Sequence, residues 1–290
     1  MRIAILGMGA IGHLVARALD GRAELVTVDR TRAPLREGER HVDAALVTTK
    51  TPGTAWAADA AAGLLDPEGV ALTIQNGLGN YETLAQRLGR GRVALGVIYV
   101  GAALRLDGSL FSTGPGAIEA APPTGEGPAR RFDELALLLR AGGMRVSVVS
   151  DPWPAVWRKL VANAAMNPTT ALFGCTNAEL LAHPAGAPLA DELARETARV
   201  ASRAGVALRE DEAVALWRRI GETLGTNRSS MLQDVAAGRP TEIDAINGAV
   251  AREGERWGTP APLNRAMTLL VAALTEPRSD AATTASAASS

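Results

Sequence analysis

The sequence predicts an α/β protein in which an N-terminal Rossmann-type, doubly wound sheet is followed by an all-helical C-terminal domain. In the first half, short apolar runs alternate with stretches whose apolar residues recur at helical spacing. This alternation is typical of crossover units that build a parallel sheet covered on both faces. A glycine-rich loop follows the first apolar run, and no convincing strand pattern occurs beyond Val156.

We expect a Rossmann domain over residues 1–150, a helical domain over residues 151–278 and a disordered tail over residues 279–290. The first boundary is indicated by the Asp-Pro-Trp-Pro segment at Asp151, which interrupts the alternating pattern. The tail is a low-complexity run of small residues that offers little apolar surface to bury.

Short apolar runs in the first hundred residues predict strands over residues 2–6, 24–28, 44–47, 70–74 and 93–100. Helical spacing between these runs predicts helices over residues 11–19, 54–65 and 81–88. One or two more strands are expected within residues 109–121, around a Gly-Pro-Gly turn. A helix over residues 132–139 and a last strand over residues 145–149 complete the domain.

The second half contains six segments with helical periodicity. They cover residues 156–167, 188–203, 210–224, 231–236, 242–257 and 262–275.

The composition excludes several classes of protein. Of the 290 residues, 47% are hydrophobic and 21% charged, and the formal net charge is -1, so nothing indicates a nucleic-acid or membrane partner. Cys175 is the single cysteine, which excludes an intramolecular disulfide and is consistent with the cytoplasm. With three scattered histidines, the chain cannot assemble a zinc-type ligand cluster. It has no signal peptide pattern and no apolar run of about 18 residues that would predict a transmembrane helix.

The loop between the first strand and the first helix has the pattern G-x-G-x-x-G at Gly7, Gly9 and Gly12. Gly7 permits the tight turn, Gly9 lets the backbone approach a pyrophosphate, and Gly12 allows close packing of the helix on the strand. The free N–H groups of the helix N-terminus would face the phosphates. The loop therefore predicts a dinucleotide site rather than a purely structural turn.

The end of the second strand bears on the choice of nucleotide, and it carries Asp29, Arg30 and Arg32. An acidic residue there would bond the ribose 2′-OH of NAD, whereas an arginine would accommodate the 2′-phosphate of NADP. Both types are present. The two arginines favour NADP, although their alternative role is that of a solvated charged loop.

Two polar residues follow later strands, at the edge where open parallel sheets bind ligands. Lys50 could meet a phosphate or be solvated, and the sequence does not distinguish these roles. Asn76 is favoured as a site residue, and its alternative role is an Asx-turn that caps the next helix.

The most informative helical segment places Lys159, Asn163 and Asn167 four residues apart, on one face of a helix. A desolvated lysine has a lowered pKa and can donate a proton to a carbonyl oxygen. Asparagine is a mediocre helix former, so this face favours binding of a small polar molecule over plain exposure. The alternative is a solvated face in which Asn167 ends the helix before Pro168.

A second polar segment spans residues 228–244. Ser230 could cap a helix or bind a carboxylate, and Thr241 with Asp244 resembles a capping box. Glu242 would then lie in a first helical turn, where it either interacts with the helix dipole or accepts a hydrogen bond from a substrate hydroxyl. Spacing alone leaves this choice open.

Taken together, five stretches resemble the ketopantoate reductase (2-dehydropantoate 2-reductase) family over nearly the whole chain. They read ILGMGAIG, TTK, QNGLGN, KLVANAAMNPTTAL and SSMLQDVAAGRPTEIDAINGAV. The last two are long and far more specific than the glycine loop. The resemblance implies an NADP-binding first domain and a helical substrate domain, with a small 2-keto acid held in the cleft between them and reduced by NADPH to serve pantothenate and coenzyme A synthesis.

The resemblance also implies roles for individual residues. Lys159 would be the general acid that protonates the keto oxygen, and Glu242 would hold the substrate. The other positions are Asn163, Asn167, Asn177 and Ser230 for substrate polar groups, Asn76 for substrate and cofactor, and Gly7, Met8, Gly9, Ala10, Ile11, Gly12, Arg30, Lys50 and Ala103 for the cofactor. Asp234 matches an acidic position of the family whose role we leave open.

The sequence leaves two alternatives to the reduction of 2-dehydropantoate. A paralogue would reduce another small 2-keto acid on the same scaffold, and the TEIDAING segment argues only against the 3-hydroxyacid dehydrogenases. A non-catalytic NADP sensor would lack a proton donor in its cleft, so Lys159 argues against that class. Apolar helical faces are compatible with a homodimer or with the core of a monomer.

Overall fold

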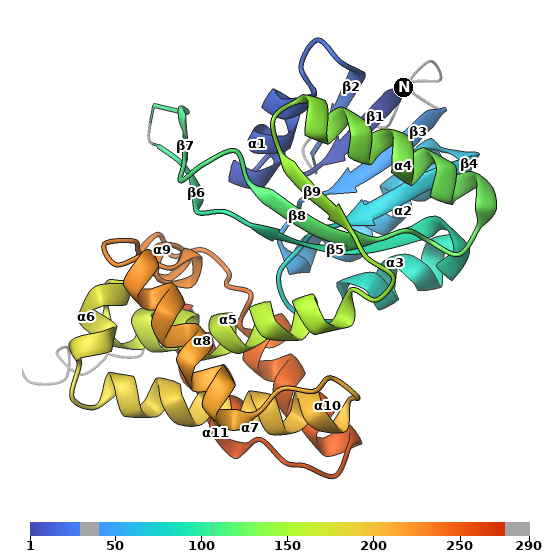
Figure 1. Cartoon of the computed structure of the whole chain (residues 1–290). Helices are drawn as coiled ribbons and strands as arrows, with labels where there is room; N and C mark the ends of the chain where they lie inside the picture. Colours follow the sequence, from blue (N-terminus) through green and yellow to red (C-terminus); the bar gives the residue numbers. More distant parts are fainter. Residues whose placement is uncertain (30–40, 106, 276–290) are drawn as a thin grey trace, which may run out of the picture.

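The computed structural model describes residues 1–29, 41–105 and 107–275. Two lobes are visible in Figure 1, with the sheet and its helices in one and the remaining helices in the other. The predicted boundary at residue 150 falls between the last strand of the first lobe and the first helix of the second. Arg30 and the tail over residues 279–290 lie outside the described residues.

The first lobe is built on a sheet that has seven strands within the described residues, in the order β2-β1-β3-β4-β5-β8-β9. These are β1 (Arg2–Leu6), β2 (Glu24–Val28), β3 (Val42–Val47), β4 (Leu65–Thr73), β5 (Val93–Tyr99), β8 (Ala117–Ala121) and β9 (Arg145–Val148). Strands β1 to β5 are parallel, β8 runs antiparallel to β5, and β9 runs parallel to β8. The predicted fold class is confirmed.

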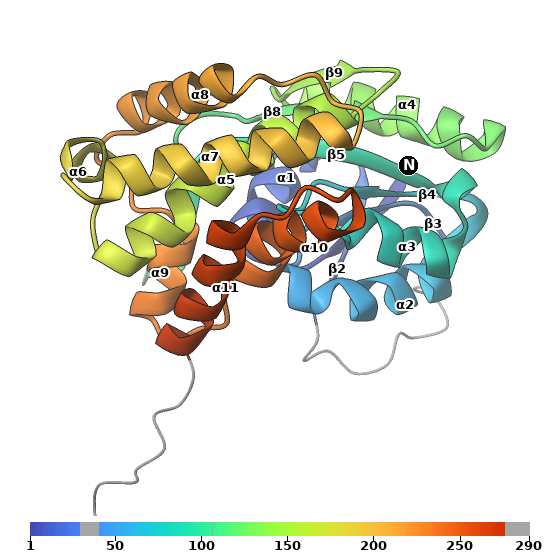
Figure 2. The same ribbon diagram turned by 90° about the horizontal axis from the view of Figure 1, so that it is seen from below.

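Alternate residues of the strands enter two cores, as a sheet that is covered on both faces requires. Ile3 and Ile5 pack with α1 (Ala10–Leu19) and α4 (Glu126–Ala141). Ala4 and Leu6 pack on the other face with α2 (Thr54–Leu64) and α3 (Asn80–Leu88). Figure 2 shows α4 and the α2–α3 pair on opposite sides of the sheet.

The segment predicted as one or two strands over residues 109–121 divides between two sheets. Its first part, β7 (Leu110–Ser112), pairs with β6 (Ala102–Leu104), a strand that the sequence pattern did not predict. Only β8 joins the main sheet, because the Gly-Pro-Gly turn at Gly114 separates it from β7. The β6–β7 hairpin lies beside α1, which begins at the glycine loop.

The described residues of the second lobe form helices joined by loops, with no strand among them. The lobe contains α5 (Trp153–Phe173), α6 (Asn177–Ala182), α7 (Gly186–Arg203), α8 (Glu210–Thr223), α9 (Ser230–Ala236), α10 (Ala249–Arg256) and α11 (Pro262–Thr275). Helix α5 contacts α6, α7, α8, α9 and α11 within the lobe and β5 outside it, so it is the central helix of the lobe and its link to the sheet.

Two local predictions in this lobe were wrong, namely the end of α5 at Asn167 and the capping box at Thr241. Helix α5 does not end at Asn167 but continues through Pro168, and the short helix α6 was missed. The helix expected from residue 242 starts with a π-helical turn, Asp244–Gly248. The capping box is absent because the Asp244 carboxylate pairs with Arg252 at 2.7 Å.

No helix within residues 1–29, 41–105 and 107–275 is long and apolar enough to cross a membrane. The same residues contain no group of three or more histidine, cysteine, aspartate or glutamate side chains placed to hold a metal ion.

We expect Gly12→Ala to lower the free energy of unfolding by about 1–3 kcal/mol, because its Cβ would lie 2.1 Å from the Gly7 carbonyl oxygen. The matched control is Gly9→Ala, whose Cβ would have no heavy atom within 4 Å and whose cost should stay below about 1 kcal/mol. Urea denaturation of both variants measures the difference. Equal losses of stability would contradict this account of the loop.

Candidate active site

The glycine loop is shaped as its sequence predicts. Gly7 has φ +106°, and a Cβ there would lie 2.7 Å from the Thr49 backbone nitrogen. The Thr48 hydroxyl donates to the Gly7 carbonyl at 2.7 Å and holds the turn against the end of β3. Gly9 is the N-cap of α1, and the first turn of α1 carries no acidic side chain and no side-chain cap. Its N–H groups therefore offer a site for the phosphates of a dinucleotide, which this loop fits.

Lys159 lies on α5 and reaches back to the sheet. Its Nζ donates to the carbonyl oxygen of Ile98 and lies 6.0 Å from the ring centroid of Tyr99. Burial of the ammonium lowers the pKa of Lys159 to about 8, against the opposing effect of the Glu242 carboxylate. A lysine in this setting is a more competent proton donor than an exposed one near neutral pH.

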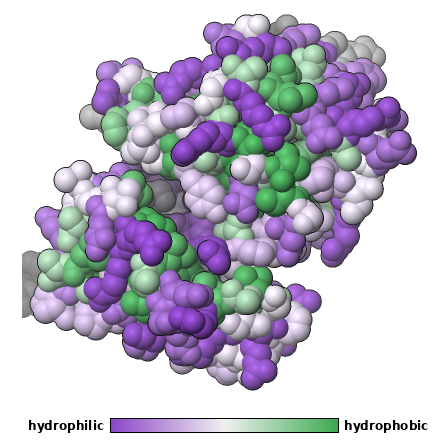
Figure 3. All heavy atoms as spheres, in the orientation of Figure 1, coloured by the Kyte–Doolittle hydropathy of each residue, from purple (hydrophilic) through white to green (hydrophobic). Residues whose placement is uncertain are grey.

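A small pocket brings the sheet edge and α5 together around this lysine. It is lined by Gln75, Asn76, Gly77, Gly96, Val97, Val156 and Lys159, with Leu95 and Leu160. The surface of the molecule is hollowed between the two lobes on the face seen in Figure 3. Asn76 and Lys159, which are 83 residues apart, thus line one pocket.

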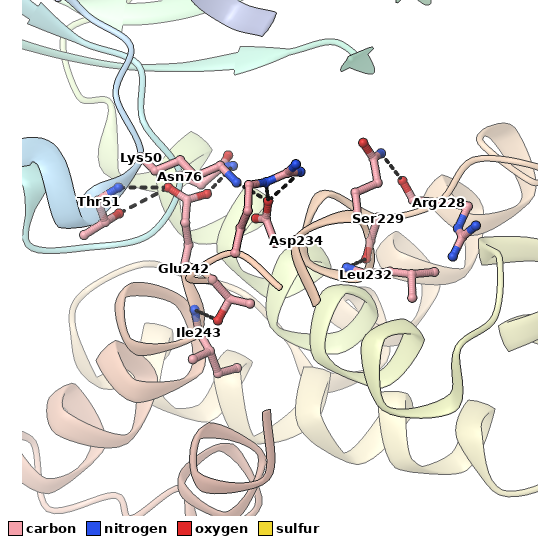
Figure 4. A network of polar contacts seen from close by, with 12 residues as sticks. Lys50, Thr51, Asn76, Arg228, Ser229, Leu232, Asp234, Glu242 and Ile243 are labelled. Atoms are coloured by element: carbon pink, nitrogen blue, oxygen red, sulfur yellow. Dashed lines mark hydrogen bonds and ion pairs between the residues drawn. The ribbon is translucent and has the colours of Figure 1, made fainter. Parts of the chain in front are cut away.

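Glu242 belongs to the helical lobe, and its side chain contacts the first lobe. Its carboxylate accepts hydrogen bonds from the Thr51 backbone N–H at 3.1 Å, from the Thr51 hydroxyl at 3.3 Å and from Asn76 Nδ2 at 3.2 Å (Figure 4). The residue is 9% exposed, so these bonds offset much of the cost of burying its charge. Glu242 therefore joins Asn76 and lies near Lys159.

A second polar link between the lobes lies beside this one. Lys50 forms an ion pair with Asp234, whose side chain is only 3% exposed, and Arg239 approaches the same carboxylate at 3.1 Å (Figure 4). Asp234 is therefore a buried carboxylate neutralised by two cations. Lys50 is directed toward this carboxylate from the strand end, near the edge where a cofactor phosphate was expected.

The backbone also joins the lobes at the pocket. The Leu78 N–H donates to the Ala245 carbonyl at 2.9 Å. Gly77 has φ +82°, and a Cβ there would lie 2.3 Å from the same oxygen. Only glycine permits this close approach, so the turn after Asn76 is shaped by its contact with the helical lobe.

The other predicted substrate residues are placed at different distances from this centre. Asn163 is partly exposed and Asn167 is 8% exposed, one and two turns along α5 from Lys159. Asn177 is buried at the start of α6, where its Nδ2 donates to the Leu224 carbonyl at 3.3 Å. In the part of the chain that the structure describes, no hydrogen bond joins the Asn177 side chain to Lys159 or Glu242. Ala103 lies on β6, beside α1.

Ser230 does not cap a helix. The cap of α9 is Ser229, whose Oγ accepts from the Leu232 N–H at 3.1 Å and bonds the Thr170 hydroxyl at 2.7 Å. Ser230 is the exposed first residue of α9, so its hydroxyl is left for another partner.

Three groups at the centre were not identified from the sequence. The Thr51 N–H and the Ile98 carbonyl are backbone groups, which carry no sequence signal. Tyr99 did have a sequence signal, because it ends a strand of the parallel set, at the edge where ligands bind.

Comparisons with known proteins agree with this arrangement. The profile described as "Ketopantoate reductase PanE/ApbA C terminal" matches residues 152–275, and that of "Ketopantoate reductase PanE/ApbA" matches residues 33–125. A 2-dehydropantoate 2-reductase from Archaeoglobus fulgidus is 32% identical over 93% of this chain and 96% of the relative. The chain belongs to the ketopantoate reductase family. It is therefore an oxidoreductase of that family, and the resemblance noted in the sequence is confirmed.

Solved structures in and near the ketopantoate reductase family have the same fold. A 2-dehydropantoate 2-reductase from Geobacter metallireducens is 26% identical, with a TM-score of 0.83 over 94% of this chain and 99% of that one. A family member from Ralstonia eutropha is 28% identical, with a TM-score of 0.80 over 95% and 98%. D-mandelate dehydrogenase, in a complex with NADH, is 25% identical, with a TM-score of 0.83 over 94% and 98%.

We expect Lys159→Met to raise the free energy of unfolding near pH 7 by about 1–2 kcal/mol, because the folded state alone desolvates the ammonium. From pH 8 to about 10.5 the native lysine loses its proton while the unfolded one keeps it. Wild-type stability therefore rises with pH in that window, and the advantage of the variant shrinks. Denaturation at several pH values measures this.

The contrasting variant is Lys50→Met, which removes one partner of the buried Asp234 and should lower stability at neutral pH. Stabilisation by Lys50→Met, or destabilisation by Lys159→Met, would contradict the conclusion that burial of the Lys159 ammonium, and not that of Lys50, lowers the free energy of unfolding.

Proposed function

We propose that this chain reduces 2-dehydropantoate to pantoate with NADPH, as a step of pantothenate and coenzyme A synthesis. The observation that carries the proposal is that Lys159 and Asn76 line one pocket between α5 and the sheet, and that Asn76 donates a hydrogen bond to the Glu242 carboxylate. Family membership supports the reaction type. NADPH, when bound, supplies the hydride.

The residues proposed for the cofactor follow the carboxyl edge of the sheet. The turn from Gly7 to Gly12 offers the N–H groups of α1 to the pyrophosphate, with Met8, Ala10 and Ile11 beside it. Arg30 is proposed to meet the 2′-phosphate, which favours NADPH over NADH, although Asp29 next to it would favour NADH. Lys50 is the candidate for a further phosphate contact, for which it would exchange its pairing with Asp234.

Lys159 is proposed to act as the general acid. Hydride transfer to a ketone builds negative charge on the keto oxygen, which a nearby ammonium stabilises and then protonates. The hydrogen bond to the Ile98 carbonyl fixes the direction of the side chain. Because burial lowers its pKa to about 8, Lys159 is protonated at neutral pH and gives up its proton more readily than an ordinary lysine.

The carboxylate of Glu242 is proposed to accept a hydrogen bond from a hydroxyl of the substrate. Thr51 and Asn76 hold this carboxylate at the cleft through three hydrogen bonds. Asn163 and Asn167 would extend the polar face of α5, and these two residues, with Asn177 and Ser230, are proposed to hold polar groups of the substrate.

A different small 2-keto acid is the alternative substrate. D-mandelate dehydrogenase shares the fold over almost the full length of both chains. The general acid and the asparagines do not by themselves distinguish one 2-keto acid from another. A homodimer is also proposed, with the exposed Leu269, Leu270 and Leu274 of α11 as its apolar surface. A location in the cytoplasm stays a prediction.

The first test is the initial rate of NADPH oxidation with 2-dehydropantoate, compared with NADH and with 2-oxoisovalerate. We expect fast turnover only with NADPH and 2-dehydropantoate. Lys159→Ala should lower kcat by about 10²–10⁴-fold. Arg158→Ala changes an exposed neighbour on α5 and should keep kcat within about threefold. Turnover of 2-oxoisovalerate alone would favour the paralogue, and a fully active Lys159→Ala would refute the general acid.

The pH dependence follows from the same lysine. We expect kcat/KM to fall as pH rises above about 8, because the proton donor is lost. Initial rates between about pH 6 and 10 test this. A profile that stays flat to about pH 10 would contradict Lys159 as the donor.

A further inference from the structure

Pro168 leaves one carbonyl of α5 without its helical partner. In an α-helix the carbonyl of Ala164 would accept from the N–H of residue 168, but proline has none. Helix α5 nevertheless runs from Trp153 to Phe173. Ala164 is fully buried, so its carbonyl has to find a donor within the protein.

That donor is Asn247. Its Nδ2 donates to the Ala164 carbonyl at 3.0 Å, across 83 residues of sequence, and the side chain is fully buried. The Thr169 hydroxyl assists one residue further along by donating to the Ala165 carbonyl at 2.6 Å. The interruption in α5 thus serves as the docking point for a side chain from another segment.

The orientation of the Asn247 amide is set by a chain of hydrogen bonds that starts at a carboxylate. Glu196, 4% exposed, accepts from the Leu263 N–H at 3.1 Å and from Asn264 Nδ2 at 2.9 Å. Asn264 therefore turns its Oδ1 toward Asn247, whose Nδ2 donates to it at 2.9 Å. The Oδ1 of Asn247 is buried and has no donor among the described residues, so this amide serves as a donor only.

Asn247 belongs to the π-helical turn Asp244–Gly248, which begins two residues after Glu242. The Ala245 carbonyl of the same turn accepts from the Leu78 N–H at 2.9 Å. The turn is therefore held by α5 on one side and by the sheet edge on the other. Such single π-helical turns occur frequently at functional sites.

We propose that Asn247 is a positioning residue, which docks on the carbonyl freed by Pro168 and thereby fixes Glu242 opposite the polar face of α5. This inference rests on the proposed function of Glu242 and Lys159. The asparagine touches neither, and it acts by setting the distance between the segments that carry them. A displacement of about 1 Å at such a pair can reduce turnover by about 10²-fold.

The test compares Asn247→Ala with Thr197→Val. Both remove a buried hydrogen bond to a helix carbonyl, but the Leu193 carbonyl that Thr197 bonds at 2.8 Å keeps its helical N–H partner. We expect both to lower Tm. Only Asn247→Ala should raise KM for the keto acid, by about tenfold or more, and lower kcat. Both should keep the Kd for NADPH within about twofold. Equal kinetics in the two variants would overturn the proposal.

Pro168→Ala supplies the decisive comparison, because it returns an N–H to the Ala164 carbonyl. In that background we expect Asn247→Ala to cost less in Tm and to change KM by a smaller factor than in the wild type. Additive effects would overturn the proposal. The cycle of Tm measurements on the wild type, the two single variants and the double variant needs no substrate. If the wild type does not turn over a 2-keto acid, the proposed function fails, and the Tm cycle still supports or refutes the docking.

Discussion

The site depends on the packing of helix α5 against strand β5. A parallel sheet delivers its polar loops to one edge, and α5 covers part of that edge. Ala155 and Val156 of the helix form a small core with Val97 of the strand, and Trp153 meets the ring of Tyr81 edge to face at 6.1 Å. This apolar contact places an ammonium where water is scarce, and one backbone carbonyl accepts its hydrogen bond. The low pKa of the lysine is therefore a product of the domain packing.

Around that contact, the two lobes are joined by hydrogen bonds and an ion pair, in which a polar group of one lobe is the partner of a polar group of the other. The acidic side chains come from the helical lobe, and the amide, hydroxyl and lysine that meet them come from loops at strand ends. A charge buried without its partner would be costly, so each lobe favours one placement of the other. Substrate and cofactor would enter an edge whose polar groups are already aligned, which reduces the ordering that binding requires.

The sequence predicted most strands and helices because the alternation of apolar runs is strong, as in β1, β2 and α11. It did not predict the strand order, which depends on pairing between distant segments, or the β6–β7 hairpin, whose strands have three residues each. The predicted end of α5 was wrong because local sequence rules treat Pro168 as the end of a helix and do not include a distant amide that bonds the freed carbonyl. Spacing placed Lys159 and the asparagines on one helical face, but Ile98 takes part only through its backbone carbonyl, and Thr51 through its backbone N–H as well as its hydroxyl. Arg30 lies outside the described residues.

The π-helical turn after Glu242 has a consequence for how this segment tolerates insertions and deletions. A π turn accommodates one residue more than the α-helical turn it replaces. Loss of a single residue within Asp244–Gly248 would let the turn relax to ordinary α-helix with the segments on either side close to their present orientation. A residue gained there has no such bulge to absorb it, and everything before it would rotate by about 100° about the axis. The glutamate would then leave the cleft while the helix stayed intact. The length of this segment, as much as its composition, is therefore under constraint.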